Sequence, residues 1–121
     1  MFSRIKNEVT RLKSKKQIDL LFTEGQHFIK KPVKLVCSNG AEALVVGFGV
    51  SKKNFPRAVD RNRVKRLMRE QFKSLRTNKD YSVFYGNGFF IYASKDMPTL
   101  EGLEKPMKEL IDQWRDSCKT S

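Results

Sequence analysis

Apolar side chains recur with the helical period in three segments of this 121-residue chain, at about 15–24, about 58–76 and from Thr99 onward. The first segment is short, because Gly25 is a typical helix stop. The third begins at Thr99, whose hydroxyl can cap a helix, and Pro106 would either kink that helix or mark its true first turn. The three apolar stripes predict three helices, each with one face on a core: Ile18, Leu21 and Phe22; Val64, Leu67, Met68, Phe72 and Leu75; Leu100, Leu103, Met107, Leu110, Ile111 and Trp114.

Between the helical segments the pattern changes to that of β-strands. Residues 43–50 alternate between two faces, as a strand does. Residues 28–37 are largely apolar but contain Pro32, which predicts one bent strand or two short ones with the proline at an edge. The aromatic segment 81–94 is either a hairpin or a loop that leads into one strand at about 88–94. The order helix, strands, helix, strand, helix predicts an α+β fold, a small sheet with helices packed on it.

Length and charge narrow the class of protein. Residues 1–121 are short enough to form one domain, and 1–13 predict a basic, flexible arm because they show no periodicity. The formal net charge of +12 points to a polyanionic partner, a nucleic acid or an anionic membrane. No apolar run is long enough to span a membrane, and the start of the chain lacks the apolar stretch of a signal peptide. The two cysteines have no metal-ligand spacing, so we expect a reduced cytoplasmic protein without a membrane partner.

Half of the net charge lies in one segment, 57–76, which holds eight basic and two acidic residues. On a helix, a row that includes Arg61, Lys65 and Arg69 adjoins the apolar stripe. Such a row repels itself unless a polyanion faces it, and the planar arginine fork suits phosphate oxygens. The predicted nucleic-acid contacts are Lys52, Lys53, Arg57, Arg61, Asn62, Arg63, Lys65, Arg66, Arg69 and Lys73.

No group of residues in the sequence is typical of protein-based catalysis. His27 is the one histidine and has no acidic or cysteine cluster near it in sequence. Gly47 and Gly49 flank Phe48 without the third glycine and helix start of a phosphate-binding loop. We therefore expect no catalytic residue and no metal site in the protein. The phenylalanines are core residues by default, although Phe22 could stack on unpaired bases if it were partly exposed.

The run from Ser51 to Glu70 resembles a sequence pattern of the protein subunit of bacterial ribonuclease P. It contains Ser-Lys-Lys, a short spacer, Ala-Val-x, and then Arg-Asn-Arg-x-Lys-Arg-x-x-Arg-Glu. The opening Arg-Leu-Lys at residues 11–13, followed by Phe22 and Gly25, fits the first helix of that family. The resemblance implies a ribosomal-protein-S5-like α+β sandwich, with about four strands in a mixed sheet and three helices. In that fold the basic helix makes a left-handed crossover between parallel strands.

The resemblance also implies a function. A catalytic RNA subunit would use Mg²⁺ to remove the 5′ leader from precursor tRNA, while the protein would bind both RNAs, cleave no bond and take no small-molecule substrate. The basic helix would contact the catalytic RNA, with Lys52 and Lys53 beside it. The leader would lie in a cleft between the first helix and the sheet, with less stacking surface than in many relatives, which have aromatics in place of Ile18 and Val36. The residues implied for this cleft are Ile18, Phe22, Val36 and Phe48.

Two other classes of function stay open on the residues alone. One is a ribosomal or RNA-chaperone protein that binds structured RNA through the same basic helix without any processing reaction. The other is a DNA-binding regulator with this helix in the major groove, which needs a second helix across the backbone and usually a dimer. Cleavage assays with the catalytic RNA distinguish the first alternative, and competition between duplex DNA and structured RNA distinguishes the second.

Overall fold

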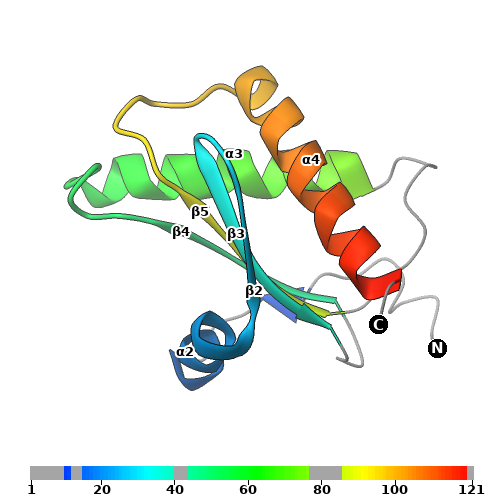
Figure 1. Ribbon diagram of the computed structural model, residues 1–121. Helices are drawn as coiled ribbons and strands as arrows, with labels where there is room; N and C mark the ends of the chain where they lie inside the picture. Colours follow the sequence, from blue (N-terminus) through cyan, green and yellow to red (C-terminus); the bar gives the residue numbers. More distant parts are fainter. Residues whose placement is uncertain (1–9, 12–14, 40–43, 77–85, 120–121) are drawn as a thin grey trace.

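A mixed β-sheet organises the protein (Figure 1). The computed structural model describes residues 10–11, 15–39, 44–76 and 86–119. Within them the sheet has five strands in the order β1-β4-β5-β3-β2. The β1–β4 and β4–β5 pairs are parallel, and the pairs of β3 with β5 and with β2 are antiparallel. Four strands are five to seven residues long, namely β2 (Gln26–Lys30), β3 (Val33–Asn39), β4 (Leu44–Val50) and β5 (Gly86–Tyr92), and the fifth, β1 (Thr10–Arg11), has two residues. This confirms the expected small mixed sheet.

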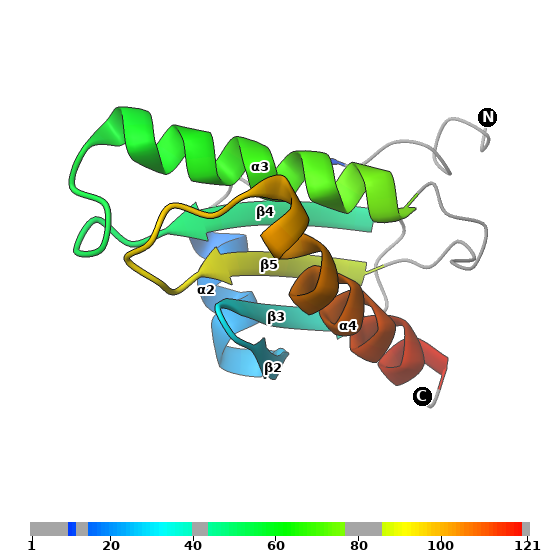
Figure 2. The ribbon, with the colours of Figure 1, turned by 90° about the horizontal axis from the view of Figure 1, so that it is seen from above.

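Three helices pack on this sheet in the described part of the chain: α2 (Lys15–Glu24), α3 (Ala58–Arg76) and α4 (Leu100–Lys119). The first two have the predicted spans. α3 and α4 cover one face of the sheet and α2 lies on the other (Figure 1). In Figure 2, α3 lies on the near side, and the chain passes from β4 through α3 to the parallel neighbour β5. This crossover is left-handed, the rare sense for such a connection, and it confirms the expected topology.

The two faces of the sheet carry cores of different size. The main core lies beneath α3 and α4, and it includes the fully buried Phe72, Phe90 and Trp114. The minor core lies beneath α2, where Leu21 and Val36 are the buried pair. The alternation along β4 decides which side chains join which core. Val46 is buried in the main core with Phe48 and Val50 against it, whereas Val45 packs on the minor core.

Helix α4 lies against β5 through close contact between an indole and glycines. A Cβ atom on Gly88 would lie 2.5 Å from the Trp114 ring, and one on Gly86 would lie 3.2 Å from its Nε1 atom. These glycines belong to β5, so the hairpin that was one alternative for Gly86-Asn87-Gly88 is wrong. The single strand of the other alternative is confirmed, although it spans Gly86–Tyr92 and not about 88–94, and the loop expected before it lies outside the described residues. The glycines leave the space that the indole fills.

Three further expectations are settled by local geometry. Thr10 and Arg11 pair in parallel with β4, so the prediction of a flexible arm over 1–13 is wrong for these two residues, and the rest of the arm lies outside the described residues. Pro32 lies in the turn between β2 and β3, which are two separate strands. α4 starts at Leu100, where the Thr99 hydroxyl accepts a hydrogen bond from the Gly102 amide at 3.0 Å. Pro106 therefore lies inside α4 and does not mark its first turn.

Candidate nucleic-acid interface

Helix α3 has a buried apolar side and an exposed cationic side. Val64 and Met68 are fully buried in the main core, which fixes the rotation of the helix about its axis. Arg63 and Arg66 on the opposite side are exposed. Side chains on this side of the helix outline an open depression, which is lined by Val59, Asn62, Arg63, Lys65, Arg66 and Arg69. Cations from successive turns of one rigid helix thus face solvent together.

Phe48 lies beneath this cationic side, in the main core. Its ring stacks on Phe90, with centroids 5.7 Å apart and an angle of 12° between the rings, and it meets the edge of Phe72. The Arg69 guanidinium lies over the Phe48 ring, 5.7 Å from its centroid. The assignment of Phe48 to the cleft beneath α2 is therefore wrong. The strand period sends Phe48 to the α3 side of the sheet and its neighbours in β4 to the α2 side.

The basic pair Lys52 and Lys53 lies on a tight turn between β4 and α3. The Phe55 amide donates a hydrogen bond to the Ser51 carbonyl at 3.0 Å, and the Lys53 amide donates to the Ser51 hydroxyl at 3.1 Å. Both lysines are exposed. Phe55 is only 6% exposed, because its ring packs 6.1 Å from that of Tyr92 in the main core. The sequence did not indicate that Phe55 anchors the spacer. A phenylalanine outside a helix or strand is not part of a helical or strand-like hydrophobic pattern.

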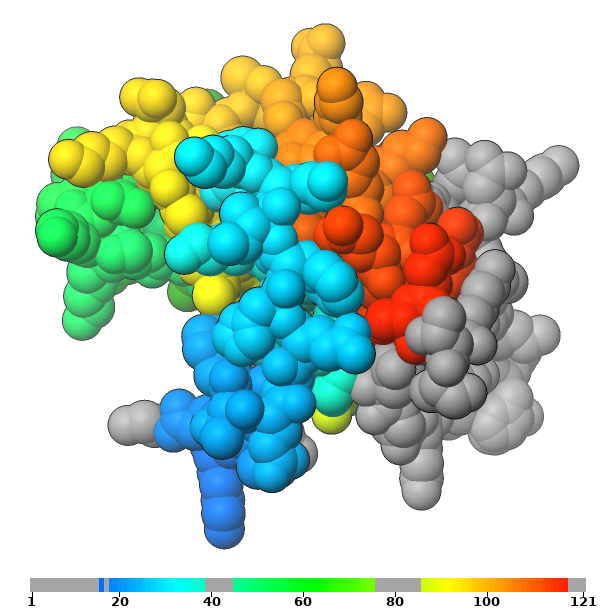
Figure 3. Space-filling model, viewed as in Figure 1, coloured from blue at the N-terminus to red at the C-terminus, as the bar shows by residue number. Residues whose placement is uncertain are grey.

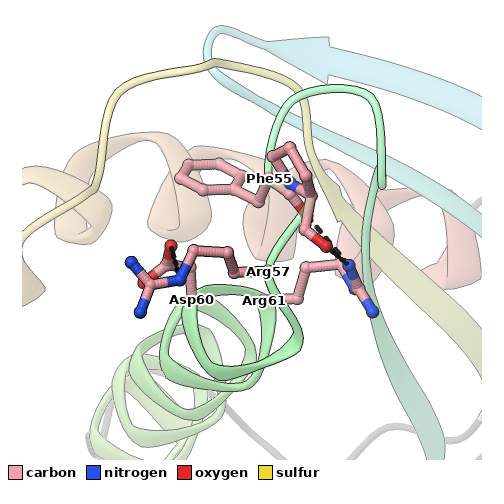
Figure 4. A network of polar contacts seen from close by, with 5 residues as sticks. Phe55, Arg57, Asp60 and Arg61 are labelled. Carbon is pink, nitrogen blue, oxygen red and sulfur yellow. Dashed lines mark hydrogen bonds and ion pairs between the residues drawn. The ribbon is translucent and has the colours of Figure 1, made fainter.

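Two arginines at the start of α3 differ in what they contact (Figure 4). The Arg61 guanidinium points back toward the spacer, where its Nη1 atom donates hydrogen bonds to the carbonyls of Phe55 at 3.0 Å and Pro56 at 2.8 Å. Arg57 lies on the surface, with its Nε atom 4.0 Å from the Asp60 carboxylate. An exposed pair at this distance contributes little to stability. Arg57 therefore stays available for a partner, whereas Arg61 is already bonded within the chain.

On the other face of the sheet, α2 packs on the strands and protrudes from the body of the molecule (blue in Figure 3). Ile18 and Val36 come together in the minor core, and Phe22 lies at its margin with 37% of its surface exposed. The Phe22 ring makes edge contacts with Phe89 and His27, with ring centroids 5.8 Å and 6.4 Å apart. Three of the four predicted cleft residues thus meet beneath α2, together with an aromatic that the sequence did not single out, Phe89.

Neither metal-binding nor membrane-spanning features stand out in the part of the chain that the structure describes. Among those residues, no three or more histidine, cysteine or acidic side chains lie close enough together to hold a metal ion. None of the described helices combines the length and the apolar character needed to cross a bilayer. Among the described residues, two features stand out as candidates for binding a ligand: the cationic side of α3, with the basic turn beside it, and the aromatic margin beneath α2.

Comparison with known proteins gives one consistent result. The family model described as Ribonuclease P matches residues 7–115. The chain is 34% identical over 112 residues to the ribonuclease P protein component of Porphyromonas gingivalis, covering 84% of this chain and 80% of that protein. It is 33% identical over 101 residues to the protein component from Nitrosococcus oceani, covering 80% and 83%.

Solved structures show the same fold. The RNase P protein of Staphylococcus aureus matches with a TM-score of 0.72 at 22% identity, over 88% of this chain and 95% of that one. The RNase P protein of Thermotoga maritima matches with a TM-score of 0.62 at 24% identity, over 88% and 96%. At these identities the structural likeness establishes the fold, and the family rests on the sequence matches.

Proposed function

The chain belongs to the ribonuclease P protein family, and we propose that it binds the catalytic RNA of that enzyme through the cationic side of α3. As a protein component of ribonuclease P, it is a subunit of an endoribonuclease holoenzyme and assists the 5′ processing of precursor tRNA. The proposal concerns which surfaces meet which RNA. We define the α3 surface by its outward cations and one amide: Lys52, Lys53, Arg57, Asn62, Arg63, Lys65, Arg66, Arg69 and Lys73.

The observation that carries the proposal is the fixed rotation of α3. Val64 and Met68 hold the helix in the main core, so Arg63 and Arg66 must face outward. A preorganised row of cations loses little entropy when phosphates bind to it. If the α3 surface neutralises roughly five phosphates, the logarithm of the binding constant falls with that of the salt concentration at a slope of about −3.5 to −4.5.

We propose that the aromatic margin beneath α2 binds the 5′ leader of precursor tRNA. We define this α2 patch as Ile18, Phe22, Val36 and Phe89. The leader is single-stranded, and proteins bind unpaired nucleotides by stacking bases on partly exposed aromatic rings. Phe22 offers such a ring, which is in edge contact with Phe89. The patch lacks a row of cations, so base stacking is its main contribution to binding.

The chemical step and its Mg²⁺ are assigned to the RNA partner. Mg²⁺ prefers carboxylate, phosphate and water oxygens, and the described part of this chain gathers no cluster of acidic side chains for it. RNA phosphates supply such oxygens, so we propose that the protein holds the RNAs in place without a catalytic residue of its own. From the family we also propose that this takes place in the cytoplasm.

Reconstitution tests the proposed function. The purified protein, added to a bacterial ribonuclease P RNA at low Mg²⁺ concentration, is expected to restore 5′ cleavage of precursor tRNA, whereas the protein alone cleaves nothing. RNA binding without restored cleavage would favour a ribosomal or RNA-chaperone protein. Clean 5′ maturation by RNA-free protein would contradict the assignment of the chemistry to the RNA.

A further inference from the structure

Arg61 is the first arginine of the Arg-Asn-Arg run, yet its side chain is directed differently from that of the second, Arg63. The Arg61 guanidinium turns back along the chain and donates from Nη1 to two successive carbonyls, those of Phe55 and Pro56 (Figure 4). Its side chain is half-buried, on the side of α3 that faces the protein. Arg63 is exposed and forms no hydrogen bond or ion pair within residues 10–11, 15–39, 44–76 and 86–119.

The two carbonyls belong to the spacer that joins the basic turn to the helix. On one side of the spacer, Lys53 is held by the Ser51 hydroxyl. In its middle, the Phe55 ring is inserted beside Tyr92 in the main core. On the other side α3 begins, and Arg61 binds the spacer from the helix. The chain between the basic turn and the basic helix is therefore fixed from both ends.

The chemistry of this contact suits an arginine, because Nη1 carries two N–H bonds fixed in the guanidinium plane, one for each carbonyl. Carbonyl oxygens held by a cationic donor form stronger hydrogen bonds than those held by a neutral one. The guanidinium is planar and rigid, so it can bind two neighbouring carbonyls while its charge stays fixed in place. A lysine at this position would keep the charge but would present a compact ammonium on a flexible stem. Charge and geometry can therefore be separated experimentally at this one residue.

We propose that Arg61 is a positioning residue, which fixes the Lys52–Lys53 turn against α3 so that the catalytic RNA meets turn and helix as one rigid surface. The proposal rests on the proposed function, because it assumes that the α3 surface binds this RNA. Arg61 itself would contribute no phosphate contact. Without the contact, the turn would leave its place beside α3, Lys52 and Lys53 would no longer meet phosphates, and RNA binding would weaken by the loss of those contacts.

Four single variants test the proposal: Arg61→Lys, Arg61→Met, and the matched controls Arg63→Lys and Arg63→Met. The dissociation constant for a bacterial ribonuclease P RNA is measured across a range of salt concentrations, at a temperature where circular dichroism shows each variant to be folded. Both Arg61 variants should bind about tenfold more weakly than the wild type at physiological salt, and both should flatten the salt slope by about 0.7–0.9 for each turn lysine that no longer meets a phosphate. Arg63→Met should flatten the slope by about 0.7–0.9, and Arg63→Lys should bind nearly as the wild type does.

A double-mutant cycle with Lys53 separates positioning from a general loss of stability. In the wild-type background, Lys53→Met should weaken RNA binding about fivefold, as the loss of one phosphate contact at physiological salt does. In the Arg61→Lys background, the same change should cost less than about twofold, because the turn is already displaced. If the double variant instead loses the full product of the two single losses in RNA affinity, Arg61 does not act through the turn.

Other outcomes overturn the proposal in recognisable ways. Wild-type affinity for Arg61→Lys, combined with a slope flattened by Arg61→Met, would make Arg61 an ordinary phosphate contact. Wild-type behaviour of both variants would leave it without a role in binding. If the wild-type protein itself shows no salt-dependent RNA binding, the proposed function fails, and that result is distinct from any difference between the Arg61 and Arg63 variants.

Discussion

The two faces of the sheet differ in how much protein covers them. On one face, α3 and α4 enclose a core that includes the fully buried Phe72, Phe90 and Trp114, and the depression on the outer side of α3 is lined by polar and charged groups around Val59. On the other face, the single short helix α2 buries Leu21 and Val36 and leaves Phe22 partly in solvent. A large core thus supports a rigid charged surface, and a thin core leaves an aromatic ring accessible.

This difference corresponds to two kinds of RNA. A folded catalytic RNA presents phosphates in a fixed arrangement, which suits a surface that does not move. A leader is single-stranded, and its bases can splay out and stack on an exposed ring. We therefore expect substitutions on the α3 side to affect every substrate alike, and those on the α2 side to matter only when a leader is present.

The largest effect should come from the core that supports the α3 surface. Phe72→Ala removes a ring that is 1% exposed and in contact with Phe48 and Phe90, and it should lower the free energy of unfolding by about 3–5 kcal/mol. Phe22→Ala removes a ring that is 37% exposed and should cost about 1–2 kcal/mol. Urea denaturation followed by circular dichroism measures both values. Equal losses would mean that the two faces do not differ in packing.

The next effect should appear in substrate binding. Phe22→Ala should weaken binding of precursor tRNA to the holoenzyme by about 1–3 kcal/mol, because one base loses its stacking partner. Affinity for mature tRNA, which has no leader, should stay unchanged. Leu20→Ala is a suitable control, since Leu20 is an exposed apolar residue of the same helix that lies outside the α2 patch. A drop in melting temperature without any leader-dependent loss would refute the role of Phe22 in leader binding.

The smallest effect should come from exposed arginines on the α3 surface. Arg63→Met combined with Arg66→Met should weaken binding of the catalytic RNA by about 1–2 kcal/mol at physiological salt and flatten the salt slope by about 1.4–1.8. The free energy of unfolding should change by less than about 0.5 kcal/mol, because both side chains are exposed. If this variant weakened binding of precursor tRNA more than binding of mature tRNA, the two faces would not have separate roles.

Periodic segments of the sequence predicted much of the fold. The apolar stripes gave the spans of α2 and α3, and the alternation over 43–50 identified β4, because helix and strand periods are local properties. The misassignment of Phe48 shows the limit of such patterns. Alternation tells which side chains share a face, but the face that α2 covers is decided only when distant strands pair.

The parts that sequence patterns missed depend on contacts outside any period. The anchor Phe55 and the contacts of Arg61 with two carbonyls involve an irregular spacer, where neither period nor composition indicates direction. The two-residue strand β1 exists through pairing with β4, a partner more than thirty residues away in the sequence. Gly86 and Gly88 suggested a turn, and only tertiary contacts explain why glycines lie within a strand: the Trp114 ring lies against Gly88, and the Ser38 carbonyl and the same ring lie against Gly86.

Crosslinking tests the division of labour between the two faces most directly. A photo-crosslinking amino acid replaces either Arg66 on α3 or Phe22 on α2, and each variant is assembled with the catalytic RNA and a precursor tRNA labelled in its leader. The account predicts that position 66 crosslinks to the catalytic RNA whether or not a leader is present, and that position 22 crosslinks to the leader. Crosslinks from position 66 to the leader would contradict it. So would crosslinks from position 22 that stay the same when mature tRNA, which has no leader, replaces the precursor.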